Sequence, residues 1–141
     1  MSWPVAVTER RRRETLLIVD DHAGFRSFAR ALLEAAGYVV LGEAADGATA
    51  VEAARALSPD LVLLDVALPD VDGFTVCERI ASAEDAASPV QPRRPLVVLT
   101  SSRDESSFRR RLAVSSARGF IAKRDLTGAA LAALVDGEAP E

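Results

Sequence analysis

Short runs of apolar residues alternate along the chain with longer segments in which apolar and polar residues mix. The apolar runs are rich in Leu, Val and Ile and predict buried strands over Leu16–Val19, Tyr38–Leu41, Leu61–Leu64, Leu96–Leu99 and Phe120–Ala122. The mixed segments carry apolar residues at helical spacing and predict helices over Ala23–Ala36, Ala48–Leu57, Phe74–Ser82, Ser106–Ser115 and Leu126–Val135. Because fully apolar strands that alternate with helices are typical of parallel sheets, the pattern predicts an α/β fold with helices on both faces of the sheet.

The length of 141 residues suits a single domain with one hydrophobic core. We expect that domain over residues 15–135, with a flexible N-terminal arm over 1–14 and a C-terminal tail over 136–141. Glycine, proline and aspartate mark the turns between the predicted elements. The one long irregular connection, which we expect to be mobile, covers Glu84–Arg94.

The composition excludes several classes of protein. A single cysteine, Cys77, and a single histidine, His22, exclude a disulfide framework and leave too few soft ligands for a structural zinc site. A formal net charge of −4 argues against a general nucleic-acid binder. The sequence has no apolar run near the ~20 residues of a membrane span, and no apolar signal-peptide region. We therefore expect a cytoplasmic protein that binds neither membranes nor nucleic acids directly.

Chemically capable side chains follow the predicted strands at their carboxyl ends. Asp20 and Asp21 follow the first strand, Asp65 the third, Thr100 the fourth and Lys123 the fifth. Open parallel sheets bind ligands outside these strand ends. If the strand order is 2-1-3-4-5, as in flavodoxin-like sheets, strands one and three are neighbours and we expect the three carboxylates to meet.

Three carboxylates gathered in this way need a cation. At a separation of ~5 Å and an effective dielectric constant near ~20, each pair repels by about 3 kcal/mol. A hard divalent cation offsets that cost, and Mg²⁺ is favoured because it takes one or two carboxylates and keeps positions for water and phosphate oxygens. Lys123 is the only lysine among seventeen cationic residues, which indicates a site that needs a compact ammonium group.

Four motifs in this order resemble the receiver domain of two-component response regulators, over about Thr15 to Val135. The motifs are LLIVDDH, DLVLLDVALPDVDG, PLVVLTS and GFIAKRD, and each lies at a predicted strand end. The resemblance implies a flavodoxin-like, doubly wound sheet of five parallel strands in the order 2-1-3-4-5. It also implies that a phosphoryl group passes from a sensor histidine kinase or a phosphotransfer protein to an aspartate of this chain.

The resemblance also implies roles for single residues. Asp65 is the expected phosphoacceptor and a ligand of Mg²⁺, while Asp21 is a direct ligand and Asp20 a ligand through water. The backbone carbonyl of Ala67 is expected to bind the same ion, although its small side chain departs from the larger or polar residue often found at this position.

Three further residues complete the expected site. Lys123 is the expected phosphoryl-binding cation, Thr100 the switch hydroxyl and Phe120 the switch aromatic. Because Phe120 lies three residues before Lys123, we expect its ring on the opposite face of the strand, toward the last two helices. We interpret His22 as a rim residue beside the acidic pocket, and Cys77 as a core residue.

Two other functions stay open. The motifs look most like receivers that precede helix-turn-helix output domains, so one alternative is the detached receiver of a DNA-binding transcriptional regulator. The absence of a helix-turn-helix pattern in these 141 residues favours a stand-alone receiver. An Asp-nucleophile phosphatase needs a second aspartate two residues after the nucleophile, where this chain has Ala67. We therefore expect a receiver that phosphorylates and dephosphorylates itself rather than a turnover enzyme.

The last predicted helix suggests a partner surface. Leu126–Val135 holds only Thr127 and Gly128 outside the apolar set, so a second apolar strip should stay exposed after one face packs on the sheet. The residues expected in this strip include Ala129, Ala133 and Leu134. We expect a homodimer, or a downstream protein that docks on the last two helices.

Overall fold

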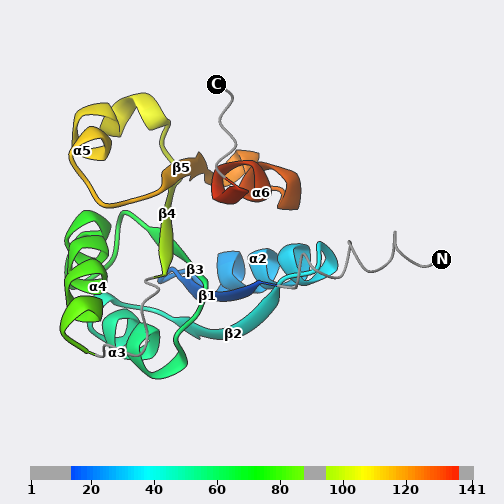
Figure 1. Ribbon diagram of the computed structural model, residues 1–141. Coiled ribbons are helices and arrows are strands. Elements are labelled where there is room, and N and C mark those ends of the chain that lie inside the picture. The colour runs from blue at the N-terminus through cyan, green and yellow to red at the C-terminus, as the bar shows by residue number, and fades with distance from the viewer. Residues whose placement is uncertain (1–13, 88–94, 137–141) are drawn as a thin grey trace.

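The computed structural model of the chain describes residues 14–87 and 95–136. Its strands form one sheet in the order β2-β1-β3-β4-β5 (Figure 1). The strands are β1 (Thr15–Val19), β2 (Val39–Ala44), β3 (Leu61–Asp65), β4 (Leu96–Ser101) and β5 (Gly119–Ala122). Every neighbouring pair of strands is parallel. The predicted flavodoxin-like α/β fold, with its strand order 2-1-3-4-5, is confirmed.

Helices cover both faces of this sheet. They are α2 (Ala23–Ala35), α3 (Gly47–Leu57), α4 (Gly73–Ala87), α5 (Arg109–Ala113) and α6 (Gly128–Asp136), with 3₁₀ turns η1 (Glu105–Phe108) and η2 (Lys123–Asp125). Figure 1 shows α2 and α6 on one side of the sheet and α3 and α4 on the other. The start of α6 lies against the end of α2, because a Cβ atom added at Gly128 would lie 2.5 Å from the Cβ of Ala36.

Alternate side chains of each strand pack into two separate layers of the core. In β1, Leu17 and Val19 pack with residues of α3 and α4, whereas Leu16 and Ile18 pack with residues of α2 and α6. These four side chains are at most 1% exposed. Each fully buried aliphatic side chain of this size stabilises the fold by roughly 1.5–3 kcal/mol. The strands β1, β3 and β4 carry buried apolar residues on both faces and are thereby fixed between two helical layers. Polar residues lie at the carboxyl ends of these strands.

Aspartates in the loops hold the helix starts near the carboxyl edge of the sheet. Asp46 caps α3 by accepting a hydrogen bond from the Thr49 amide at 2.8 Å. Asp70, which lies in the loop after β3, accepts hydrogen bonds from the amides of Gly47 at 2.8 Å and Ala48 at 3.1 Å. Because these amides belong to the first turn of α3, the carboxylate of Asp70 ties the β3–α4 loop to a second helix start.

Gly73 allows α4 to begin directly against the end of β3. A Cβ atom at this position would lie 2.4 Å from the carbonyl oxygen of Asp65 and 2.8 Å from the Cα of Val66. The Gly73 amide donates a 2.7 Å hydrogen bond to the Val66 carbonyl. The short loop that follows Asp65 is therefore closed by a residue without a side chain.

Several predicted boundaries differ from the structure. The prediction that an irregular connection begins at Glu84 was wrong, because α4 continues to Ala87; the remainder of that connection, 88–94, and the expected arm up to residue 13 lie outside the described residues. The predicted helix Ser106–Ser115 is instead the 3₁₀ turn η1 followed by the short helix α5. Serine side chains compete for backbone hydrogen bonds, which favours turns and helix ends over the interior of a regular helix.

The last helix is also displaced from its predicted bounds. It begins at Gly128 rather than Leu126, because η2 occupies the residues just before Leu126. It ends at Asp136, one residue past the boundary expected for the domain. Within residues 14–87 and 95–136, no helix is both long and apolar enough to span a bilayer.

Candidate functional site

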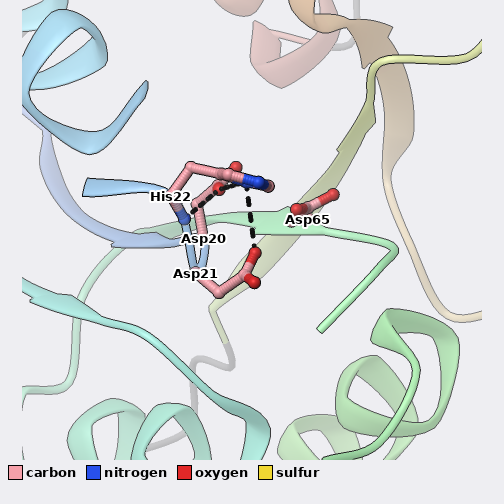
Figure 2. Close-up of side chains that lie close together, drawn as sticks. All are labelled: Asp20, Asp21, His22 and Asp65. Atoms are coloured by element: carbon pink, nitrogen blue, oxygen red, sulfur yellow. Dashed lines mark hydrogen bonds and ion pairs between the residues drawn. The ribbon is translucent and has the colours of Figure 1, made fainter. Parts of the chain in front are cut away.

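Polar side chains gather where β1 and β3 end side by side. Asp20 and Asp21 follow β1 directly, and Asp65 is the last residue of β3. Because β1 and β3 are neighbours, one ligand atom from each of these aspartates and one from His22 lie within 4.8 Å of one another. Figure 2 shows the four side chains around this point. The three carboxylates meet, and a histidine joins them.

Asp20 is the most buried carboxylate of the cluster, with its side chain 1% exposed. Its Oδ1 atom accepts a 2.9 Å hydrogen bond from the His22 amide and lies 3.2 Å from His22 Nδ1. Its Oδ2 atom accepts no hydrogen bond from the residues that the structure describes. Lys123 Nζ does lie 2.7 Å from that oxygen, but as an ion pair whose angles are not those of a hydrogen bond. The oxygen therefore keeps capacity to bind a cation.

Asp65 is buried and its carboxylate has two partners besides the acidic cluster. The Ala67 amide donates a 3.2 Å hydrogen bond to Oδ1, and Lys123 Nζ lies 3.4 Å from Oδ2. Burial raises the pKa of Asp65 above its ordinary value, and the negative charge of Asp20 raises it further. The ammonium of Lys123 acts in the opposite direction on this pKa. A bound cation at this carboxylate would likewise favour its charged form.

Lys123 lies between the carboxylates and an aromatic ring. Its side chain is 17% exposed, and Nζ lies 4.6 Å from the ring centroid of Phe25 in α2. Arg26, the next residue, donates a 2.6 Å hydrogen bond from Nη1 to the backbone carbonyl of Asp20. The sequence analysis missed both residues, because Phe25 reads as an ordinary apolar helix position and Arg26 as an ordinary exposed charge.

Thr100 lies in register with Asp65 across β3 and β4. Its side chain is buried, and its backbone carbonyl accepts a 2.9 Å hydrogen bond from the Val66 amide. The hydroxyl that the sequence singled out is therefore on the strand beside the one that ends in Asp65. Ala67 follows in the loop after β3, where it is exposed and donates its amide to Asp65.

Phe120 is 8% exposed and belongs to the core layer that faces α3 and α4. Its ring lies 5.7 Å from that of Phe108 in η1, which lies 6.0 Å from that of Phe74 in α4. Lys123 instead lies over α2, on the opposite face, as expected. The expectation that Phe120 faces the last two helices was wrong for α6, because α6 packs in the other layer through Leu131.

The exposed strip expected on α6 is smaller than predicted. Ala129 and Ala133 are exposed. Leu134 is partly buried in the core layer of α2 and α6. Its side chain packs over Gly119 in β5, where an added Cβ atom would lie 2.8 Å from Leu134 Cδ2. The third residue of the predicted strip therefore stabilises the packing of α6 on the sheet, and only the two alanines of that strip are exposed.

Oxygen donors from Asp20, Asp21 and Asp65 fit a small, hard divalent cation. The donor set is of the type that Mg²⁺ prefers, and a buried carboxylate oxygen without a hydrogen bond lies in it. Lys123 lies at the same edge of the sheet as these carboxylates. Together with the five-stranded sheet in the order 2-1-3-4-5, these features define a class of α/β domain that has a charged pocket at the carboxyl edge of its sheet.

Comparisons with known proteins identify the family. The model of the response regulator receiver domain matches residues 16–135, and the chain belongs to this family. It is 37% identical over 110 residues to a transcriptional regulator of Pseudomonas aeruginosa, an alignment that covers 78% of this chain and 49% of that protein. It is 40% identical over 72 residues to the chemotaxis protein CheY of Bacillus subtilis, which covers 51% of this chain and 60% of CheY.

A solved structure gives the same result. The signal receiver domain of the response regulator NarL from Mycobacterium tuberculosis superposes with a TM-score of 0.72 and 31% identity, covering 89% of this chain and 98% of that one. The chain spans about half the length of the transcriptional regulators that it matches. Receiver domains are signalling domains rather than turnover enzymes in general. They bind Mg²⁺ at an acidic pocket and interact with histidine kinases or phosphotransfer proteins.

Proposed function

We propose that this chain is a phosphoacceptor receiver domain, which takes a phosphoryl group onto Asp65 and thereby switches a protein-interaction surface. The observation that carries the proposal is the position of Lys123, whose Nζ lies 2.7 Å from Asp20 and 3.4 Å from Asp65. Carboxylates at the ends of the neighbouring strands β1 and β3, with an ammonium group from the residue that follows β5, supply a nucleophile and a charge partner for the incoming phosphoryl group. The domain that does this is proposed to cover residues 15–135.

The chemistry is transfer of a phosphoryl group between two proteins. A carboxylate oxygen of Asp65 attacks the phosphorus of a phosphohistidine on a sensor histidine kinase or a phosphotransfer protein. A P–O bond forms, the P–N bond breaks, and the electron pair of that bond goes to the departing imidazole nitrogen, which then takes a proton from solvent. The product is an aspartyl phosphate, and no oxidation or reduction is involved.

Residues of this chain stabilise the charge that gathers during transfer. Lys123 neutralises oxygens of the transferred group, and the hydroxyl of Thr100 donates a hydrogen bond to one of them. Asp20, Asp21 and Asp65 hold Mg²⁺ with the backbone carbonyl of Ala67. When bound, Mg²⁺ supplies positive charge that offsets the repulsion between the carboxylates and the phosphoryl oxygens.

The same pocket limits how long the signal lasts. Water hydrolyses the acyl phosphate at Asp65, so the domain resets itself and turns over little substrate. We propose that the domain acts in the cytoplasm. Its proposed readers are other proteins, or a second copy of this chain, that dock on α5 and α6. We propose no direct contact with nucleic acid.

A second candidate function is favoured by the relatives. Transcriptional regulators of Pseudomonas aeruginosa and Mycobacterium tuberculosis match this chain over about half of their own length. The domain is then the receiver part of a DNA-binding regulator, and Asp65 phosphorylation controls an output domain. An Asp-nucleophile phosphatase is disfavoured because Ala67 occupies the position of its second aspartate.

The test is phosphorylation with a small donor, acetyl phosphate, in the presence of Mg²⁺, followed by intact-mass spectrometry. The wild type should gain one phosphate that is stable in acid and labile in base, and Asp65→Asn should gain none. The matched control is Asp46→Asn, which changes the aspartate that caps α3 outside the pocket and should be labelled like the wild type. Full labelling of Asp65→Asn would reject Asp65 as the acceptor, and rapid multiple turnover of a generic phosphatase substrate would favour the phosphatase.

A further inference from the structure

The acidic pocket contains an imidazole that the proposed function does not use. His22 lies between β1 and α2, and its Nδ1 atom is 3.2 Å from Asp20 Oδ1 and 3.2 Å from Asp21 Oδ1. Figure 2 shows these two contacts as dashed lines that converge on the ring. His22 is the only histidine of the chain. His22 Nδ1 therefore lies equally close to the carboxylates of two neighbouring residues.

The spacing of these atoms fits ligands of one ion. Two atoms that each bind an ion at about 2.1 Å, with right angles or tetrahedral angles between them, lie about 3.0–3.4 Å apart. Both distances from Nδ1 fall in this interval. Asp65 contributes a further atom, since the four ligand atoms all lie within 4.8 Å of one another. The imidazole can therefore bind an ion together with the carboxylates without a large rearrangement.

Two further observations point to a cation rather than to packing. The His22 side chain is 69% exposed, so the protein core does not hold the ring in this orientation. Asp20, by contrast, is 1% exposed, and its Oδ2 atom accepts no hydrogen bond from the described residues. A buried carboxylate whose Oδ2 atom has an ion pair with Lys123 but no hydrogen bond lies beside an exposed ring turned toward it, and a divalent cation would bind both side chains.

We propose that His22 Nδ1 becomes a ligand when a first-row transition-metal dication occupies this pocket, and that the pocket therefore binds such dications more tightly than Mg²⁺. This inference rests on the proposed function, because it concerns the cation of the same site. Imidazole suits Zn²⁺, Co²⁺ and Ni²⁺, whereas Mg²⁺ prefers oxygen ligands and keeps several waters. One nitrogen among carboxylates thus sets the preference of the site for its metal.

The experiment compares two ions on the purified 141-residue chain without an affinity tag. Co²⁺ is the transition-metal probe, because its visible absorption reports on its ligands, and Mg²⁺ is the reference; both affinities are measured by titration. The wild type should bind Co²⁺ more tightly, and His22→Gln should lower the Co²⁺ affinity by about 10-fold to 100-fold. The same variant should change the Mg²⁺ affinity by less than about threefold, because Mg²⁺ draws on the oxygen ligands.

Two control variants separate the ligands. Asp21→Asn should weaken the binding of both ions, because it removes a shared oxygen ligand. Cys77→Ala should change neither affinity, since the only thiol of the chain is buried in the core. His22 precedes α2 and its side chain makes no capping hydrogen bond to the helix, so His22→Gln keeps the helix start and its effect can be assigned to the metal.

A spectroscopic measurement identifies the bound atom directly. With ¹⁵N-labelled histidine the chain gives a single imidazole spin system, because it has one histidine. Addition of ¹¹³Cd²⁺ should split the Nδ1 signal by scalar coupling to the metal, and leave Nε2 without such a coupling. An unsplit Nδ1 signal in the metal-saturated protein would overturn the assignment.

Other outcomes distinguish this inference from the proposed function. If Mg²⁺ binds and Asp65 is phosphorylated, but His22→Gln leaves the Co²⁺ affinity unchanged, the ligand assignment is wrong and the receiver function stands. If Co²⁺ binds through His22 but Asp65 takes no phosphate from acetyl phosphate, the function is wrong and the ligand assignment stands. If neither ion binds to the wild type, the inference is overturned together with the proposed metal site.

Discussion

The ammonium group of Lys123 lies 2.7 Å from Asp20 Oδ2. Both side chains are largely withdrawn from water, so this ion pair offsets part of the repulsion between the carboxylates of the pocket. Replacing Lys123 by Gln removes the cation and leaves the buried carboxylates uncompensated. We expect Lys123→Gln to lower the free energy of unfolding by about 3 kcal/mol in the absence of divalent cations, measured by urea unfolding.

The neighbouring arginine provides the control for that variant. Arg124 forms an ion pair with Asp104 in which both side chains are more than half exposed. Because exposed ion pairs contribute little, Arg124→Gln should change the free energy of unfolding by less than about 1 kcal/mol. Equal losses in the two variants would show that the position of Lys123 in the pocket has no special importance for stability.

The raised pKa of Asp65 predicts that neutralising its carboxylate stabilises the protein. Burial and the charge of Asp20 raise this pKa, so the charged form of Asp65 is less favourable in the folded than in the unfolded chain. Without divalent cations at neutral pH, Asp65→Asn should raise the free energy of unfolding by about 1–3 kcal/mol. Asp46→Asn should leave it nearly unchanged, since asparagine caps a helix as well as aspartate does.

The raised pKa of Asp65 also fixes the direction in which the free energy of unfolding changes with pH. Between the ordinary pKa of an unfolded aspartate and the raised pKa of Asp65, the folded chain binds more protons than the unfolded chain, so this residue lowers stability as pH rises. The advantage of Asp65→Asn should therefore be largest above the raised pKa and should vanish at acidic pH. Urea unfolding of both proteins over that range measures the difference, and an advantage that grows on acidification would contradict the assignment.

A third prediction concerns the response of the fold to Mg²⁺. Asp21 is the most exposed of the three aspartates, with its side chain 35% exposed, so its loss should not unfold the protein. Mg²⁺ at 100 times its dissociation constant should stabilise the wild type by about 2.7 kcal/mol, and Asp21→Ala should remove most of this gain. Calorimetry with and without Mg²⁺ measures the response, and Asp125→Ala, which changes an exposed carboxylate in η2, should respond like the wild type.

The hydrophobic pattern was sufficient to predict the sheet and the strand ends. Apolar runs without polar interruptions indicate strands buried on both faces, and in a parallel sheet their carboxyl ends share one edge. Asp20, Asp65 and Lys123 could therefore be brought together from the sequence, although they are separated by up to about a hundred residues. The roles that we propose for them come from the family resemblance rather than from this pattern.

Other features of the site depend on side-chain torsions and loop paths that the pattern does not contain. His22 reads as a rim residue in the sequence, and only the direction of its ring brings Nδ1 to two carboxylates. Asp70 caps α3 from a loop more than twenty residues further along the chain. The end of α4 at Ala87 was missed because the acidic residues before it and the prolines after it suggest a loop.

The last prediction concerns how phosphorylation of Asp65 reaches the surface. Thr100 lies beside Asp65 in the β3–β4 register, and the next strand carries Phe120. The ring of Phe120 contacts that of Phe108, which contacts that of Phe74 at the start of α4. The three rings form a continuous row under η1 and α4. A movement of the Thr100 hydroxyl toward new phosphoryl oxygens would change the packing at one end of this row.

Arg111 connects this row of rings to the surface of the protein. Its guanidinium lies 4.3 Å from the ring centroid of Phe74, and its Nη2 atom lies 2.7 Å from Asp72 Oδ2. Asp72 also accepts a hydrogen bond from the Thr75 amide at 3.1 Å, in the first turn of α4. A change in the packing of Phe74 therefore acts on an ion pair that joins α5 to the start of α4.

We expect beryllofluoride, a mimic of the phosphoryl group, to shift NMR signals from Asp65 through Phe120 and Phe108 to Arg111. Thr100→Ala should still allow phosphorylation of Asp65 but reduce the shifts at Phe120 and beyond. Phe108→Leu, which removes the middle ring at a cost of about 1–2 kcal/mol, should confine the shifts to the pocket and β5. Phe28→Leu changes a ring on the opposite face that is 53% exposed, and should leave the wild-type response intact. Shifts that reach Arg111 equally in Thr100→Ala and Phe108→Leu would show that the signal takes another route, because in those variants the row of rings is uncoupled at its start or broken at its centre.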